Sequence, residues 1–197
     1  MRPERSVPPF AIDLTRFGRR SVTSFYSNLV TRPTGRAVRM GVESQLAELV
    51  EERQLCVSIL DFSQVGVIDY SCADEIVAKL LLRYAGETRP SQVYFLVSGL
   101  QEHQEDAVEA VLERHSLLAV GEDAARGYHL LGPCDPFQRA CWAALVLRRI
   151  ASAHDLAEDV RIPDGVAGTI LGSLVAKRVA VELPDGRVCG LPALVGK

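Results

Sequence analysis

Hydroxyl and carboxylate side chains gather in one short stretch of the sequence, Asp69-Tyr70-Ser71-Cys72-Ala73-Asp74-Glu75. Two carboxylates can carry out acid–base catalysis when their surroundings push their pKa values apart. A serine can act as a nucleophile when a base lies beside it, and it can also carry a phosphate. The stretch is therefore a candidate for catalysis, for phosphorylation or for a purely structural role.

A structural role at the start of a helix accounts for much of this stretch. Ser71 or Asp69 can accept hydrogen bonds from the N–H groups of a helix that begins near Cys72. Ser71 and Asp74 have the spacing of a capping box. Asp74 and Glu75 would lie in the first turn, where the positive end of the helix dipole favours acids. Capping therefore explains these residue types without any chemistry.

Catalysis is the weakest of the three interpretations. An enzyme would need a pocket into which Asp69, Ser71 or Asp74 points beside a histidine, and no histidine is near Ser71 in the sequence. Metal-ligand spacing is absent from the four histidines, which are His103, His115, His129 and His154. The chain has no G-x-x-x-x-G-K-[ST] phosphate loop and no G-x-G-x-x-G dinucleotide motif. The sequence predicts a non-enzymatic protein with no metal and no cofactor, and an enzyme built on the 69–75 cluster stays an alternative.

The elements around the cluster predict an α/β domain. An apolar run at 56–62 suits a strand that is covered on both faces of a sheet. Apolar residues then recur at helical spacing from Ala73 to Tyr84. Further strands are predicted at 10–15, 93–98 and 127–132, and further helices at 38–53 and around 107–112. Helices between short buried strands indicate helices packed on a largely parallel sheet.

The junction between strand and helix resembles a known signature. A buried strand ending in Leu60-Asp61-Phe62, a loop and the motif Ser71-Cys72-Ala73-Asp74-Glu75 are similar to the STAS superfamily, named for sulfate transporters and anti-sigma-factor antagonists. The similarity is closer to a STAS-like group of bacterial proteins with a Ser-Phe-Ala-Asp-Glu-type motif. It covers about residues 10–132, and its specific part lies at 59–77. The resemblance implies a STAS-like sheet with helices packed on it.

The resemblance also implies a regulatory module that binds other proteins. In the antagonists, a kinase related to histidine-kinase ATPases phosphorylates the hydroxyl directly after the loop aspartate, and this modification switches partners. That position is Tyr70 here, which a serine kinase is not expected to use, so Ser71 is the candidate phosphorylation site. The expected partner is such a kinase-like ATPase or an anti-sigma-like protein. We expect the 69–75 turn and the exposed face of its helix to bind it, through Asp69, Tyr70, Ser71, Asp74, Glu75, Lys79 and Arg83.

Residues 135–197 predict a separate, winged-helix-like domain. Asp135 can cap a first helix, the Ser152–Asp155 pattern can cap a second, Pro163 can begin a third, and a hairpin follows at the Pro184-Asp185-Gly186 turn. Three helices followed by a hairpin are the order of a winged helix-turn-helix. The third helix is predicted to bury Val166, Ala167, Ile170, Leu171, Leu174 and Val175.

A winged helix can bind DNA through its third helix, but this tail is poorly equipped to do so. It contains eight Lys and Arg residues and seven Asp and Glu residues, which leaves little positive charge for phosphate contacts. The outer face of the third helix has no Arg, Asn or Gln for bidentate base contacts. We therefore expect this domain to contact protein, either the first domain or a second subunit. In the alternative of DNA binding, the contacts would be Arg161, Thr169, Ser173, Lys177 and Arg187.

The composition fits a folded globular protein. The 197 residues are 48% hydrophobic, and their net charge of −3 offers no overall attraction to nucleic acid or to acidic membranes. The first residues contain no apolar segment of a signal peptide, and no apolar run reaches the length of about 18 residues that spans a membrane. Five scattered cysteines fit neither a disulfide framework nor a zinc site. We expect a cytoplasmic bacterial protein that acts in partner switching or transcription control, with a homodimer left open.

Overall fold

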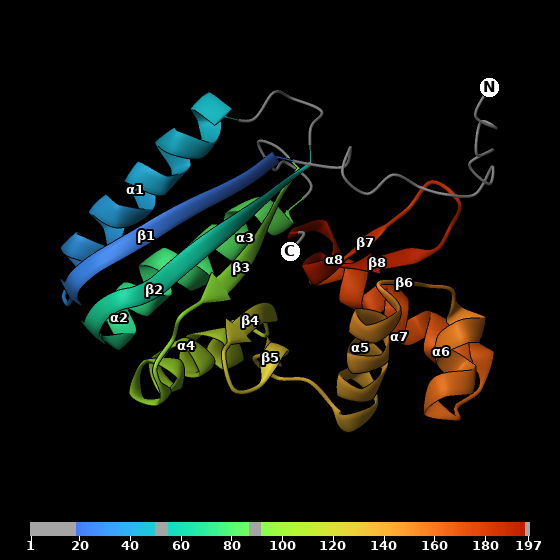
Figure 1. Cartoon of the computed structure of the whole chain (residues 1–197). Helices are drawn as coiled ribbons and strands as arrows, with labels where there is room; N and C mark the ends of the chain where they lie inside the picture. The colour runs from blue at the N-terminus through green and yellow to red at the C-terminus, as the bar shows by residue number, and fades with distance from the viewer. Residues whose placement is uncertain (1–18, 50–54, 87–91, 196–197) are drawn as a thin grey trace, which may run out of the picture.

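A five-stranded sheet forms the centre of the molecule, in a computed structural model that describes residues 19–49, 55–86 and 92–195 (Figure 1). The strands lie in chain order across the sheet and are β1 (Arg19–Leu29), β2 (Cys56–Ile68), β3 (Val93–Ser98), β4 (Ala119–Asp123) and β5 (Gly127–Leu131). The first four strands run parallel, and β5 runs antiparallel to β4. The expected α/β class with a largely parallel sheet is thereby confirmed.

Helices join the parallel strands and cover one face of the sheet. They are α1 (Arg32–Leu49), a continuous helical segment made of α2 (Tyr70–Ala73), the π-helical turn η2 (Asp74–Ala78) and α3 (Lys79–Ala85), and then α4 (Glu102–Arg114). Right-handed crossovers between parallel strands in sequential order place all of these helices on the same side. Their buried side chains share one core with alternate residues of the strands, such as Leu60 and Phe95.

The C-terminal segment covers the opposite face of the sheet. Its elements are α5 (Pro136–Arg148), β6 (Ile150–Ala151), α6 (Ala153–Val160), α7 (Asp164–Ala176), β7 (Ala180–Glu182), β8 (Val188–Gly190) and α8 (Leu191–Val195). The strands of this segment form an antiparallel sheet in the order β6-β8-β7. Trp142 and Leu145 of α5 are buried in the same cluster as Ile59 and Leu96 of the central sheet. A second apolar core, on this face of the sheet, therefore joins the C-terminal segment to the central sheet.

Local sequence signals predicted several element boundaries well. The β3 strand has the predicted bounds, and Asp135 caps α5 by accepting hydrogen bonds from the N–H groups of Phe137 (2.8 Å) and Gln138 (2.9 Å). Ser152 and Asp155 form the expected capping box at the start of α6. The hairpin of β7 and β8 is present as well.

Other expectations were wrong or lie outside the described residues. The predicted strand at 10–15 lies outside them. Strands β1, β4 and β6 were missed, and α1 begins at Arg32, six residues before the predicted start at Val38. Val166 was expected to be buried in α7, but 45% of it is exposed because it lies on the outer side of that helix. Within the described ranges, no helix has the length and apolar character that crossing a membrane requires.

Candidate functional site

Asp69 joins the first turns of two helices. Its Oδ1 accepts hydrogen bonds from the Cys72 backbone N–H (2.7 Å) and from the Ser71 hydroxyl (2.9 Å), and its Oδ2 accepts one from the Thr31 N–H (2.9 Å). Burial alone would raise the pKa of Asp69, but the hydrogen bonds from Thr31 and Cys72 outweigh it and lower that pKa. The predicted cap at Asp69 is confirmed. The predicted capping box of Ser71 with Asp74 is wrong, since Ser71 donates to Asp69 instead.

Asp74 and Glu75 are buried, which corrects the expectation that they lie on the exposed face of the helix. Only 6% of Asp74 and 2% of Glu75 is exposed to solvent. All residues from 72 to 78 are buried, because this helical segment packs on the sheet with its inner side and against α1 and α4 with its flanks. The acidic side chains are therefore not available to a partner. Of the residues predicted to lie on that face, Lys79 is partly exposed and Arg83 is exposed.

Gly35 of α1 and the π-helical turn explain how the two acids come to be enclosed. A Cβ at Gly35 would lie 2.9 Å from the Cα of Cys72 and 3.0 Å from the Cβ of Glu75, so the helices touch at this point with no room for a side chain. The π-helical turn over 74–78 widens the helix where these acids lie. Such turns inside α-helices are rare and are frequently found at functional sites.

Basic side chains from three helices surround the two buried carboxylates. The Arg32 guanidinium reaches Asp74 (2.8 Å) and Glu75 (3.0 Å) from α1. Arg39 contacts Glu75 at 3.3 Å, and Lys79 forms an ion pair with the same carboxylate. From the other side, the His115 Nε2 lies 2.9 Å from Asp74 Oδ1, just after the end of α4.

Hydrogen bonds and charge from these neighbours keep both carboxylates charged. Burial would raise the pKa of Asp74, but hydrogen bonds with Arg32 and His115 lower it below its ordinary value. Burial would likewise raise the pKa of Glu75, and hydrogen bonds from Lys79 and Arg32 lower it. A carboxylate whose pKa is lowered in this way is a weak base, and it does not hold a proton for use as an acid at neutral pH.

Basic and hydroxyl groups form the exposed surface above the buried acids. Tyr70 is 37% exposed, and its hydroxyl accepts a hydrogen bond from the Arg114 guanidinium (3.2 Å). The Arg32 side chain is 50% exposed while its guanidinium faces the acids. We name the cations of this surface the basic rim; its members are Arg32, Lys79 and Arg114.

The sequence did not identify the contact between the Asp74 carboxylate and the His115 imidazole. The two residues are 41 positions apart, and no local spacing connects them. A carboxylate beside an imidazole is a familiar catalytic arrangement, but here Ser71 donates its hydroxyl to Asp69, so its proton is directed away from the pair. Over the described ranges, no three His, Cys, Asp or Glu side chains come together so that they could hold a metal ion.

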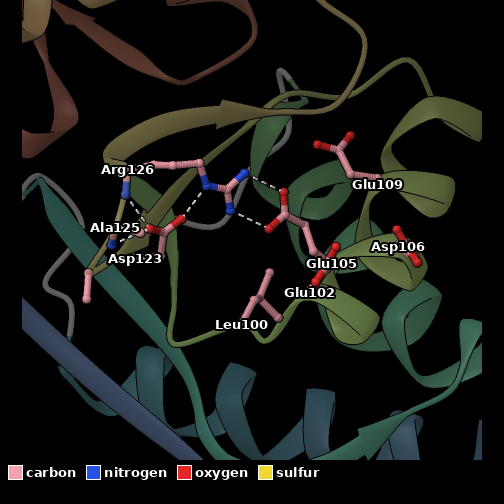
Figure 2. Close-up of a pocket in the computed structure, with 9 residues that line it drawn as sticks. Leu100, Glu102, Glu105, Asp106, Glu109, Asp123, Ala125 and Arg126 are labelled. Atoms are coloured by element: carbon pink, nitrogen blue, oxygen red, sulfur yellow. Dashed lines mark hydrogen bonds and ion pairs between the residues drawn. The ribbon is translucent and has the colours of Figure 1, made fainter.

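A separate acidic pocket of about 610 Å³ lies between α4 and the β4–β5 turn (Figure 2). Arg126 bridges two of its acids, with Nη1 2.9 Å from Glu105 Oε1 and Nε 2.6 Å from Asp123 Oδ2. Its remaining acids, which also lie around the hollow in Figure 2, are Glu102, Asp106 and Glu109. Sequence reasoning missed this pocket, although the acids of α4 recur at 102, 105, 106 and 109, the spacing of one helix face.

The residues named for DNA binding are scattered over the C-terminal segment. Arg161 is the exposed C-cap of α6, and the Thr169 hydroxyl donates to the carbonyl of Gly165 within α7. Ser173 accepts a hydrogen bond from Gln138. Lys177 lines a pocket of about 110 Å³ between α3 and α7, and Arg187 bonds to Asp185 at 2.8 Å. Three of these five side chains therefore have partners within the chain itself.

No protein-family model matches the chain, and no curated protein matches it.

Proposed function

We propose that the protein is a non-enzymatic, cytoplasmic regulatory protein that binds another protein at the basic rim and Tyr70. In this proposal the 59–77 signature belongs to a STAS-like domain, and the protein acts in partner switching or transcription control. The order of strand β2, the Asp69 turn and the helix that follows it supports this interpretation. The contact surface differs from the one expected from sequence, because the acids lie beneath it.

The observation that carries the proposal is the separation of charge between the interior and the surface. Asp74 and Glu75 are enclosed, and the groups that a partner could touch are the Tyr70 ring and the guanidiniums of Arg32 and Arg114. Arg and Tyr are enriched at the energetically important positions of protein interfaces. A basic surface is complementary to an acidic one, so the partner should present carboxylates or a phosphate.

Ser71 stays a candidate for phosphorylation under this proposal. Its side chain is partly exposed beside the N-terminus of the helical segment, and Arg114 reaches the neighbouring Tyr70. A phosphate adds about −1.5 to −2 charges, which would offset the basic rim and weaken its attraction for an acidic partner. Phosphorylation would then release the partner.

The C-terminal segment supports a winged-helix-like interpretation in which protein contact is the main role. The order α5, β6, α6, α7, β7 and β8, with β8 between β6 and β7, fits that interpretation. The apolar core shared with the central sheet supports contact within the chain.

DNA binding is the second candidate. Fluorescence anisotropy with a random duplex at low salt tests it: tight binding with a steep salt dependence would favour DNA.

Affinity capture with quantitative mass spectrometry tests the proposed partner surface. The variant Tyr70→Ala with Arg114→Glu removes exposed groups and leaves the cations around Asp74 and Glu75 in place. We expect it to lose, by at least about tenfold, a protein that the wild type captures from its host. Arg161→Glu makes the same charge change on α6 and should retain that protein. Equal capture by all three forms would refute the proposal.

A further inference from the structure

A small apolar pocket of about 110 Å³ lies between the end of α3, the start of β3 and the end of α7. We name it the α3–α7 pocket. Strand β3 begins at Val93, but its pairing with β4 runs only from Leu96 to Ser98. Leu117 and Leu118, just before β4, line the opposite side of the gap that results. The pocket is therefore a consequence of the short pairing between these two strands.

Buried aromatic side chains form the walls of the α3–α7 pocket. Tyr84 of α3 and Phe95 of β3 meet edge to face, with their ring centroids 5.3 Å apart. Tyr94 follows on the other face of β3, and at most 7% of each of these three residues is exposed. Aromatic pairs of this kind favour a further ring at a similar distance. An apolar cavity of about 150 Å³ holds benzene, so this smaller pocket suits a group no larger than one ring.

The solvent side of the α3–α7 pocket is positively charged. Lys177 and Arg178 line it at the end of α7, and no Asp or Glu does so among the described residues. The Arg178 guanidinium belongs to the wall, since it lies 3.9 Å from the centroid of the Tyr94 ring and donates to the Val93 carbonyl at 2.8 Å. Lys177 is partly exposed and forms no ion pair within the part of the chain that the structure describes. One such ammonium beside an apolar pocket is complementary to a ligand with a single negative charge.

The backbone at the end of α7 is held in a conformation that places these cations at the pocket. Arg178 has a left-handed φ of 59°, at the position after the helix where glycine is usual. Its N–H donates to Val175 (2.9 Å), and the next N–H, of Val179, donates to Leu174 (3.1 Å). An arginine at this position costs free energy, and backbone strain of this kind clusters at ligand sites. The strained turn fixes Lys177 on the same side of the pocket as Arg178.

We propose that the α3–α7 pocket binds a small aromatic carboxylate, with its ring between the aromatic walls and its carboxylate beside Lys177. Burial of the ring would supply most of the affinity, and the contact with the ammonium would set the orientation. A ligand with one ring and one charge contact should have a dissociation constant on the order of 1 mM. The pocket lies at the opposite end of the 70–85 helical segment from Tyr70, about 20 Å along its axis. This site is therefore independent of the partner surface proposed at the basic rim.

Titration of the ¹⁵N-labelled full chain with sodium benzoate tests the site by nuclear magnetic resonance. The amide signals of Ala85, Val93 and Leu118 should shift and saturate, and that of Tyr70 should stay in place. Benzylamine has the same ring with the opposite charge and should bind at least about tenfold more weakly. Shifts centred elsewhere, no saturation below about 20 mM benzoate, or equal binding of benzylamine would each overturn the proposal.

Charge variants test the assignment of the carboxylate to Lys177. Lys177→Gln should weaken benzoate binding by at least about fivefold and leave the binding of neutral benzyl alcohol unchanged. Arg161→Gln is the matched control, because it removes one positive charge from the exposed end of α6, and it should bind both compounds like the wild type. Unchanged benzoate binding by Lys177→Gln, or an equal loss of both compounds, would overturn the assignment.

A blocking variant tests the location without relying on charge. Ala176 is exposed and lines the pocket, so Ala176→Phe can place a ring over the opening without entering the core. It should reduce the binding of benzoate and of benzyl alcohol by at least about tenfold. Circular dichroism verifies that the variant folds. A folded Ala176→Phe variant that binds both compounds like the wild type would show that they bind elsewhere.

Discussion

The contact at Gly35 predicts opposite effects for two glycine substitutions in the same helix. Gly35 and Gly41 both lie in α1, and alanine at either position has a higher helix propensity than glycine. At Gly41 a new Cβ meets nothing within 4 Å, so Gly41→Ala should stabilise the protein by about 0.5–1 kcal/mol. At Gly35 a new Cβ would lie 2.9 Å from the Cα of Cys72, which is backbone and cannot rotate away.

Gly35→Ala should therefore destabilise the protein. Overpacking a well-packed contact costs about 1–3 kcal/mol, and the gain in helix propensity offsets about 1 kcal/mol of that cost. The expected net loss is about 1 kcal/mol, so the two variants should differ by about 2 kcal/mol. Pushing α1 outward also moves Arg32, three residues before Gly35, away from Asp74 and Glu75.

Urea unfolding followed by far-UV circular dichroism measures both variants. A chain of this size shifts its melting temperature by about 2–4 °C per kcal/mol, so thermal melts should agree in sign. Stabilisation of the same size by Gly35→Ala and Gly41→Ala would show that α1 does not touch the helical segment at Cys72. In that case the enclosure of Asp74 and Glu75 would lose its structural explanation.

Three further predictions concern the groups around the site. Acid should destabilise the fold, because the pKa values of Asp74 and Glu75 are lowered: their contribution is present above the unfolded-state values of about 4 and is lost as pH falls through the folded-state values. Urea midpoints at neutral pH and at about pH 3 measure this loss, and Glu75→Gln should reduce it. His115→Ala removes the hydrogen bond to Asp74 and should cost about 1–2 kcal/mol, and an unchanged midpoint would argue against that contact. Burial raises the pKa of the Cys72 and Cys189 thiols to about 11, so mass spectrometry should find both unlabelled by iodoacetamide at about pH 8 until the protein is denatured, and rapid native labelling would contradict their burial.

The elements that could be predicted from sequence are those specified by local signals. The 56–62 and 93–98 runs are apolar enough to mark strands covered on both faces, and Asp135 marks the start of α5 by its own side chain. In contrast, β4 is a five-residue strand that contains Gly121 and ends in two acids, so its composition gives little strand signal. Its place in the sheet depends on pairing with β3 and β5, which lie elsewhere in the sequence.

The candidate site likewise has one part that local signals specify and another part that depends on residues distant in the sequence. The cap at Asp69 was predictable, since two of the groups that donate to its carboxylate, Ser71 and the Cys72 N–H, lie within three residues of it. The burial of Asp74 and Glu75 was not predictable, because acids are seldom buried unless they are paired. Their partners Arg32 and His115 come from other helices, more than 40 positions away in the sequence. Only the packing of α1 and α4 on the helical segment reveals that the surface is basic rather than acidic.

Site-specific photocrosslinking tests the central claim, that a partner docks on the surface around Tyr70. The photoreactive residue p-benzoylphenylalanine replaces Tyr70 in one variant and Arg161 in the other, and both are irradiated in the host cell. The account predicts a covalent adduct at position 70 with a protein whose attached peptide is acidic or phosphorylated, and no such adduct at position 161. Adducts at position 161 with none at position 70 would contradict it.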